Sequence, residues 1–167
     1  MNYFLVAIVA YFLGSISFAM IVSRLFGLPD PRTYGSNNPG ATNVLRSGNK
    51  WAAALTLLGD ALKGWLAVTL ASRASPLLGL GEVAVAIAAL FVFLGHLFPV
   101  LYQFKGGKGV ATALGVLLAL DWRVGIAVAI IWLALFAATK TSSVAALVAT
   151  AATPIVAYYF HGADLIS

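Results

Sequence analysis

Long apolar blocks alternate with short polar segments along the chain. The apolar blocks cover residues 3–26, 51–71, 77–101, 110–120, 124–139 and 144–160. A helix of about 20 apolar residues crosses the hydrocarbon core of a bilayer, and backbone inside the bilayer must satisfy its own hydrogen bonds. The pattern therefore predicts an all-α polytopic membrane protein with about six membrane helices.

One block is too short to be an ordinary span. Residues 110–120 would form a helix only about 16 Å long at 1.5 Å per residue. We therefore expect this helix to start inside the membrane, after a cytoplasmic re-entrant loop formed by the glycine-rich residues 102–109. Residues 72–76 are expected to be a tight connection between helices, and residues 121–123 are expected to break the apolar pattern between two blocks.

Composition supports a membrane protein and excludes several other classes. The 167 residues are 62% hydrophobic and 9% charged, whereas a soluble domain has about 45–50% and about 25%. So few charges do not cover a water-facing surface, which excludes a soluble enzyme, a disordered tail and a collagen-like fibre. The lack of cysteine excludes disulfides and thiolate chemistry, and two histidines leave too few ligands for a metal, so we expect neither metal nor cofactor.

The basic residues predict how the chain is oriented. If the N-terminus lies outside and each block crosses once, Arg73 and Arg123 face outward and Lys63 lies within a span. The remaining basic residues face the cytoplasm: Arg24, Arg32, Arg46, Lys50, Lys105, Lys108 and Lys140. This positive-inside bias explains the net charge without nucleic acid as a partner. It also puts three polar segments, residues 27–50, 102–109 and 140–143, on one side, where they can form one site.

The segment GSNNPGATNVLR, residues 35–46, is rich in hydrogen-bond donors. Clustered amides and hydroxyls next to an arginine suit an anion, particularly phosphate. The candidate phosphate-binding residues in it are Ser36, Asn38, Thr42, Asn43 and Arg46. The alternative is a solvated loop followed by a capped helix, because Gly, Asn and Pro also favour turns for their own backbone reasons.

The segment FKGGKGVAT, residues 104–112, carries two lysines among three glycines before a helix. Glycines let backbone N–H groups turn toward a ligand, and a helix N-terminus adds positive potential. Lys105, Gly106, Gly107, Lys108 and Gly109 are therefore candidates for binding phosphate, although the spacing is not that of a Walker A motif. The alternative, a loop whose lysines contact lipid head groups, explains the lysines and not the glycines.

Three other polar residues fall within apolar blocks. Asp60 and Lys63 are three positions apart on one helix face, so they are expected to pair, either for function or to fix helix packing. His96 precedes Pro99 and is interpreted as capping backbone groups that the proline frees, with a general base or phosphate ligand as the alternative. Ser142 and Ser143 begin the last block, where helix capping is expected and a phosphate contact is the second possibility.

These residues predict a cytoplasm-facing phosphate site, and by themselves they do not separate an enzyme from an anion transporter. The lack of an internal repeat and the one-sided placement of the motifs count against transport. A purely structural protein whose loops bind lipid head groups is the third possibility, and the glycine- and asparagine-rich motifs count against it.

In order along the chain, the motifs GSNNPGATNVLR, GDALKG, GHLFPVLYQFKGGKGVATALG and TKTSSVAALVATAATP resemble those of the bacterial acyl-phosphate:glycerol-3-phosphate acyltransferase family. The resemblance implies transfer of a fatty acyl group from acyl phosphate to glycerol 3-phosphate, giving 1-acylglycerol 3-phosphate (lysophosphatidate) and phosphate in the first step of phospholipid synthesis. It also implies a place in the bacterial cytoplasmic membrane, contact with membrane lipid, and a functional link to an enzyme that produces acyl phosphate.

Matched by motif, the resemblance assigns catalytic roles to Ser36, Arg46, Lys105 and Ser143, with Asp60, Lys63 and His96 in support. We expect Arg46 and Lys105 to neutralise phosphate and the two serines to orient it. Members of the family usually continue through a seventh helix and a basic tail that contains His and Asn. We therefore expect residues 1–167 to be a single membrane domain that lacks this last helix and tail.

Overall fold

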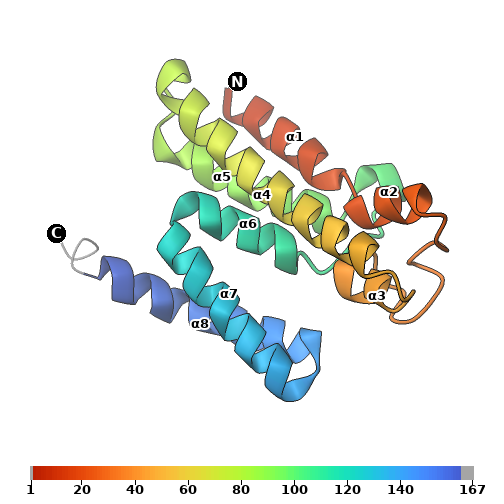
Figure 1. Cartoon of the computed structure of the whole chain (residues 1–167). Helices are drawn as coiled ribbons and strands as arrows, with labels where there is room; N and C mark the ends of the chain where they lie inside the picture. The colour runs from red at the N-terminus through yellow and green to blue at the C-terminus, as the bar shows by residue number, and fades with distance from the viewer. Residues whose placement is uncertain (1, 163–167) are drawn as a thin grey trace. The chain divides into compact units, whose positions relative to one another are not determined.

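The computed structural model describes residues 2–162, which are mostly helical, with a longer loop at residues 26–40 (Figure 1). The elements in chain order are α1 (Asn2–Ser15), α2 (Phe18–Leu25), α3 (Ala41–Leu45), α4 (Lys50–Leu78), α5 (Gly81–Leu97), the 3-10 turn η1 (Val100–Tyr102), α6 (Val110–Leu120), α7 (Trp122–Thr139) and α8 (Ser142–His161). The chain divides into two compact units, Met1–Val116 and Leu117–Ser167.

Five helical segments are long and apolar enough to cross a membrane. They are Asn2–Leu25, Lys50–Leu78, Gly81–Tyr102, Trp122–Thr139 and Ser142–His161. The apolar helix α6 is shorter than these five and has the bounds that the sequence predicts. Large apolar side chains such as Phe4, Leu58 and Leu77 point away from the protein, as lipid-facing residues do. The prediction of an all-α polytopic membrane protein is confirmed.

The first unit packs through glycines that let helices approach closely. A side chain at Gly14 or Gly95 would collide with the backbone of the facing helix in the α1–α5 pair. Gly64 and Gly115 play the same part where α4 meets the start of α6. Small residues at such crossings are typical of membrane helices, because van der Waals contact replaces the hydrophobic effect as the force that holds them together.

The first apolar block is a broken helix. The structure interrupts it at Ile16 and Ser17, between α1 and α2, where the sequence pattern shows one continuous span. The ammonium of the buried Lys63 on α4 fills this gap and binds backbone carbonyls there. The break is therefore held open by a side chain from another helix, which the local sequence does not reveal.

The predicted connection at residues 72–76 is wrong. These residues continue α4 as far as Leu78, and the turn falls at Gly79 and Leu80. Gly79 adopts φ 65°, its N–H donates to Pro76, and the N–H of Leu80 donates to Ser75. This pattern of hydrogen bonds is a Schellman motif, so the left-handed glycine ends the helix, whereas the polar residues before it are compatible with helix.

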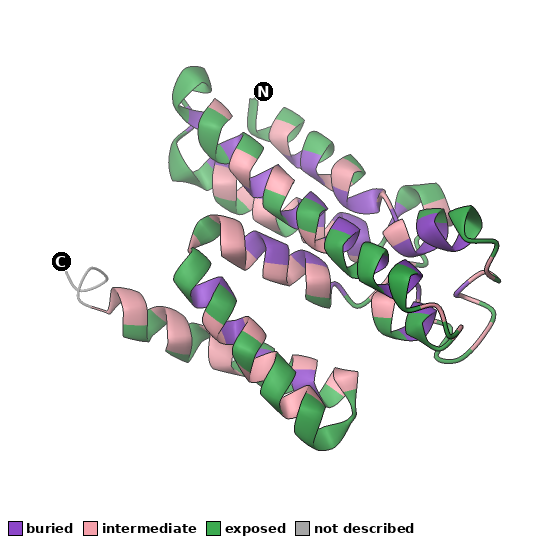
Figure 2. Cartoon of the chain, viewed as in Figure 1, coloured by how far each residue is buried: buried purple, intermediate pink, exposed green. Residues whose placement is uncertain are grey.

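In the second unit, α7 and α8 pack against each other. Val124, Val128 and Ala149 form the core of this pair, and Trp132 and Phe160 pack against it. Figure 2 shows that most other residues of both helices are partly or fully exposed. Of the predicted break at residues 121–123, only Asp121 lies outside a helix, between α6 and α7. Its side chain caps α7 by accepting a hydrogen bond from the N–H of Arg123.

Candidate functional site

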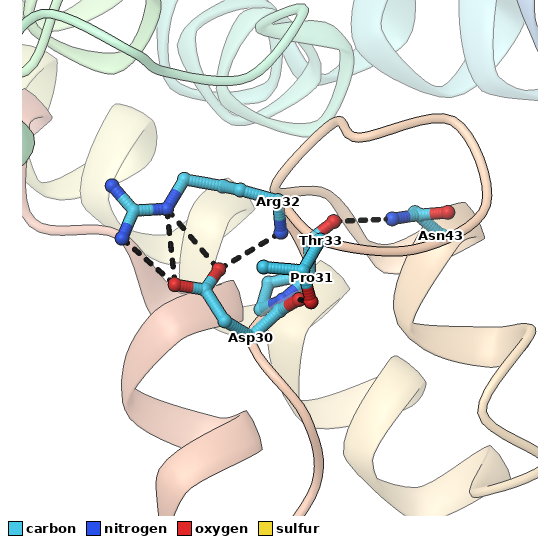
Figure 3. Close-up of polar contacts among 5 residues, drawn as sticks. All are labelled: Asp30, Pro31, Arg32, Thr33 and Asn43. Carbon is cyan, nitrogen blue, oxygen red and sulfur yellow. Dashed lines mark hydrogen bonds and ion pairs between the residues drawn. The ribbon is translucent and has the colours of Figure 1, made fainter.

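Asn43 organises the first polar loop. Its side chain is 2% exposed, and its oxygen Oδ1 accepts a hydrogen bond from the N–H of Ser36 at 2.9 Å. Its Nδ2 donates to the carbonyl of Pro31 at 2.7 Å (Figure 3) and to that of Tyr34 at 3.1 Å. Both ends of the amide are hydrogen-bonded within the loop, so the Asn43 side chain holds the loop in shape. The sequence predicts that this side chain binds phosphate directly.

Arg46 and Ser36 lie at exposed positions of the same loop. Gly35, with φ 59°, leaves room for the Arg46 side chain, since a Cβ at Gly35 would lie 3.0 Å from Arg46 Cδ and would collide with Asn43 Oδ1. Arg46 therefore lies over the backbone next to Ser36, and the structure brings these two predicted residues together. Thr42 is also exposed, and Asn38 is half-buried beside Gly40.

Asp30 and Arg32 form an ion pair that the sequence analysis does not single out. The guanidinium donates to both carboxylate oxygens at 2.8 to 3.2 Å, and the backbone N–H of Arg32 donates to Asp30 Oδ1 at 2.8 Å (Figure 3). The side-chain hydrogen bonds from Arg32 hold the pKa of Asp30 below its ordinary value, and the same contact raises the pKa of Arg32. An Asp-Pro-Arg run in a polar segment was the available signal for this pair.

The second polar loop leaves α5 through two residues in the left-handed region. Gln103 and Phe104 have φ of 57° and 60°, and the N–H of Phe104 donates to the carbonyl of Pro99. A conformation that non-glycine residues rarely adopt is held here by the loop's own hydrogen bonds. It places Lys105 at an exposed position directly before the glycines.

The glycines of this loop pack against the end of α5. A Cβ at Gly106 would collide with the carbonyls of His96 and Leu97, and one at Gly107 would collide with the imidazole of His96. The N–H of Gly107 donates to the carbonyl of His96 at 3.2 Å. This N–H, which was expected to face a phosphate, is thus engaged within the protein. Gly109, with φ 76°, fits between Phe93 and Leu97 just before α6 starts.

The two loops meet around a cavity of about 460 Å³ in the first unit. Its lining contains both charges of the ion pair and the predicted Lys105 and Gly106; the full set is Asp30, Arg32, Thr33, Asn37, Pro39, Gln103, Lys105 and Gly106. Residues 27–50 and 102–109 therefore come together as predicted. Most of the lining residues are polar or charged, and Lys105 adds a positive charge to the Asp30–Arg32 pair.

The predicted pair on α4 is present. Lys63 Nζ lies 3.0 Å from Asp60 Oδ1, and both side chains are buried. His96 Nδ1 lies 3.1 Å from the hydroxyl of Thr112, at the start of α6. The ring of His96 thus contacts a side chain of another helix, which differs from the expected capping of backbone groups near Pro99.

Ser143 lies in the second unit. It is the second residue of α8, half-buried, and Thr141 rather than a serine is the N-cap residue of this helix. Its approach to the other two loops stays a prediction. In the same unit Asp121 binds both Arg123 and His161, the latter at 2.7 Å. Within residues 2–162 no group of three His, Cys, Asp or Glu side chains is placed to hold a metal ion.

Comparison with known proteins gives a consistent result. The family model described as "Glycerol-3-phosphate acyltransferase" matches residues 4–167. A curated protein of that name from Paraburkholderia phymatum is 58% identical over 167 residues, which is 100% of this chain and 80% of the relative. Another from Nitrosospira multiformis is 63% identical over 153 residues, which is 92% of this chain and 76% of the relative.

Solved structures agree with the sequence relatives. Crystal structures of PlsY (YgiH), described as an integral membrane glycerol 3-phosphate acyltransferase, cover 98% of this chain and 78% of their own. The glycerol 3-phosphate form is 36% identical with a TM-score of 0.83. The lysophosphatidic acid form is 34% identical with a TM-score of 0.82.

Proposed function

Because the chain belongs to the glycerol-3-phosphate acyltransferase family, we propose that it transfers a fatty acyl group from acyl phosphate to glycerol 3-phosphate. The products are lysophosphatidate and inorganic phosphate. The observation that carries this proposal is the polar cavity where Lys105 meets the loop of Asp30, Arg32 and Asn37. Both substrates carry phosphate, and this cavity joins two loops whose exposed basic residues suit it.

Acyl transfer from acyl phosphate requires positioning of the substrates and charge stabilisation, and it does not require a nucleophile from the protein. Acyl phosphate is an activated mixed anhydride, so a hydroxyl of glycerol 3-phosphate can attack its carbonyl carbon directly. The new ester C–O bond forms as the bond from the acyl carbon to the phosphate oxygen breaks, and the departing phosphate can take the hydroxyl proton. Bringing the two substrates together and stabilising charge on the leaving phosphate then supply the rate increase.

The predicted site residues fall into two groups, those placed to contact substrate and those that shape the two loops. Lys105 lines the cavity, and Arg46 and Ser36 lie exposed on the first loop. In the proposal Lys105 and Arg46 neutralise phosphate, and Ser36 and Ser143 orient it. Asn38, Thr42 and Lys108 add polar contacts, whereas Asn43, Gly106 and Gly107 hold the loops in shape.

The proposal also covers location and partners. The positive-inside bias supports a multi-pass protein of the bacterial cytoplasmic membrane with its N-terminus outside and its site facing the cytoplasm. An apolar groove between helices would hold the acyl chain, so the reactive end reaches the site from the bilayer. The donor requires an enzyme that produces acyl phosphate.

The test uses purified protein in lipid with glycerol 3-phosphate and one of three donors: acyl phosphate, acyl-CoA or acyl carrier protein. We expect lysophosphatidate and phosphate from acyl phosphate alone. Arg46→Ala and Lys105→Ala should both abolish most of this activity. Equal rates with acyl-CoA would contradict acyl phosphate as the specific donor. Phosphate uptake into vesicles without acyl transfer would contradict acyltransferase activity and favour a transporter.

A further inference from the structure

The ammonium of Lys63 is buried at the break between α1 and α2. It is 2% exposed and donates hydrogen bonds to the carbonyls of Gly14 at 2.8 Å and Ile16 at 2.6 Å. Its third neighbour is Asp60 Oδ1 at 3.0 Å. Two of the ammonium's donors are therefore hydrogen-bonded to carbonyls, and the carboxylate of Asp60 compensates its charge as an ion-pair partner. The two carbonyls are those that the interruption of the helix would otherwise leave without partners.

The carboxylate of Asp60 connects this ammonium to a histidine on the next helix. Asp60 Oδ1 lies 3.6 Å from His96 Nδ1, and that nitrogen lies 3.1 Å from the hydroxyl of Thr112. All of these side chains are buried. A charged cluster at this depth is costly, and apolar side chains of similar size would pack helices as well or better, so packing alone does not explain it.

His96 carries the cluster to the second loop of the cavity. Its carbonyl accepts the N–H of Gly107, and its ring nitrogen Nε2 lies directly against Gly107. Gly107 is two residues from Lys105, which lines the cavity. The imidazole therefore packs directly against the loop that presents Lys105.

Lys63, at the other end of the cluster, contacts the helix break that leads to the first loop. Lys63 holds the break after α1, and α2 runs from there to Leu25, five residues before the cavity residue Asp30. The two walls of the cavity are thus attached to opposite ends of one buried cluster. We propose that Asp60, Lys63, His96 and Thr112, here called the Lys63 cluster, are positioning residues that set the spacing of the two loops and so the productive placement of substrate phosphate.

This inference rests on the proposed function only for its kinetic test. Thr112→Val keeps the shape of a fully buried side chain and removes the hydroxyl beside His96. We expect it to lower kcat/KM for glycerol 3-phosphate by about 10-fold to 100-fold, because small displacements of positioned groups cost rate steeply. Thr56→Val is the matched control, since Thr56 is equally buried and its hydroxyl donates only to the carbonyl of Ala52 in its own helix.

His96 allows a rescue test. His96→Leu fills the space without a polar group, whereas His96→Asn keeps an amide near the position of Nδ1. A positioning role predicts that the Asn variant retains more of kcat/KM than the Leu variant. Equal losses in both, or a loss in Thr56→Val as large as in Thr112→Val, would overturn the proposal in favour of general packing.

A second readout does not depend on catalysis. The chain has no cysteine, so Thr33→Cys and Gln103→Cys, both exposed and on opposite walls of the cavity, accept spin labels specifically. Electron paramagnetic resonance should show one narrow distance distribution in the parent and a broader one in Thr112→Val and in the charge-neutral double variant Asp60→Asn/Lys63→Met.

The two readouts separate the possible failures. If the parent shows no acyl transfer from acyl phosphate while the distances broaden in the variants, the proposed function fails and the positioning role stands. If the parent is active and neither kcat/KM nor the distance distribution changes in Thr112→Val and His96→Leu, the positioning role is wrong.

Discussion

At the scale of single residues, the cavity combines one neutralised cation with one that has no acidic partner. Arg32 is held by both oxygens of Asp30. Lys105 faces the same cavity and forms no ion pair with a carboxylate in the described part of the chain. Because an uncompensated charge near a low-dielectric region acts strongly on an anion, the proposed phosphate site should depend more on Lys105 than on Arg32.

Lys105 lines the cavity and Lys108 does not, which predicts unequal effects for these two lysines of the second loop. Lys105→Ala should lower kcat/KM for glycerol 3-phosphate by about 100-fold or more, because it removes charge stabilisation at the site. Lys108 is exposed on the same loop and does not line the cavity, so Lys108→Ala should have a much smaller effect. Steady-state kinetics on both variants checks the prediction, and equal losses would argue against the cavity as the phosphate site.

Asn43 and Asn49 give a second matched pair. Asn43→Asp puts a carboxylate oxygen against the carbonyls of Pro31 and Tyr34, which now accept from Nδ2. We expect a loss of about 1–3 kcal/mol in the free energy of unfolding, together with loss of activity, because buried acceptors are left facing each other. Asn49→Asp should be nearly neutral, since an aspartate caps the start of α4 equally well. Thermal unfolding in detergent measures both.

At the scale of elements, helix ends show what local sequence can and cannot predict. The bounds of α6 were predictable because Gly109 and Asp121 are strong boundary residues on either side of an apolar run. The end of α4 was not, because polar residues at 72–76 resemble a break in the sequence pattern, whereas the left-handed Gly79 ends the helix. The break after α1 was equally hidden, since the carbonyls there are bound by Lys63 from a helix far along the chain.

Two glycines with different roles test this distinction. Gly79→Ala keeps all packing and adds only the strain of a left-handed alanine, so we expect a cost of about 1–2 kcal/mol. Gly95→Ala forces a methyl group against the backbone of α1 at Tyr11 and must push two membrane helices apart. Its apparent unfolding temperature in detergent should therefore fall further than that of Gly79→Ala. The reverse order would mean that the α1–α5 contact adapts easily.

At the scale of the whole molecule, hydropathy was enough to predict the fold class. Charge and glycine spacing singled out Lys105 and Gly106, which line the cavity, while their role in binding phosphate stays a prediction. Asp30, Arg32, Asn37 and Gln103 were missed as cavity residues. They come from segments about 70 residues apart, and their meeting depends on how α4 and α5 place the two loops. Tertiary packing, which no local pattern encodes, therefore completes the site around residues whose chemistry is visible in the sequence.

The orientation of the whole chain leads to a prediction that the lack of cysteine makes simple to test. If the positive-inside bias sets the topology, Thr33→Cys faces the cytoplasm and Ser72→Cys faces outward; both positions are exposed. In spheroplasts a membrane-impermeant maleimide should label Ser72→Cys and should reach Thr33→Cys only after lysis, with the cysteine-free parent as the blank. The opposite labelling would place the cavity outside the cell. Acyl phosphate made in the cytoplasm could not then reach it without crossing the membrane, so the same result would count against the proposed donor.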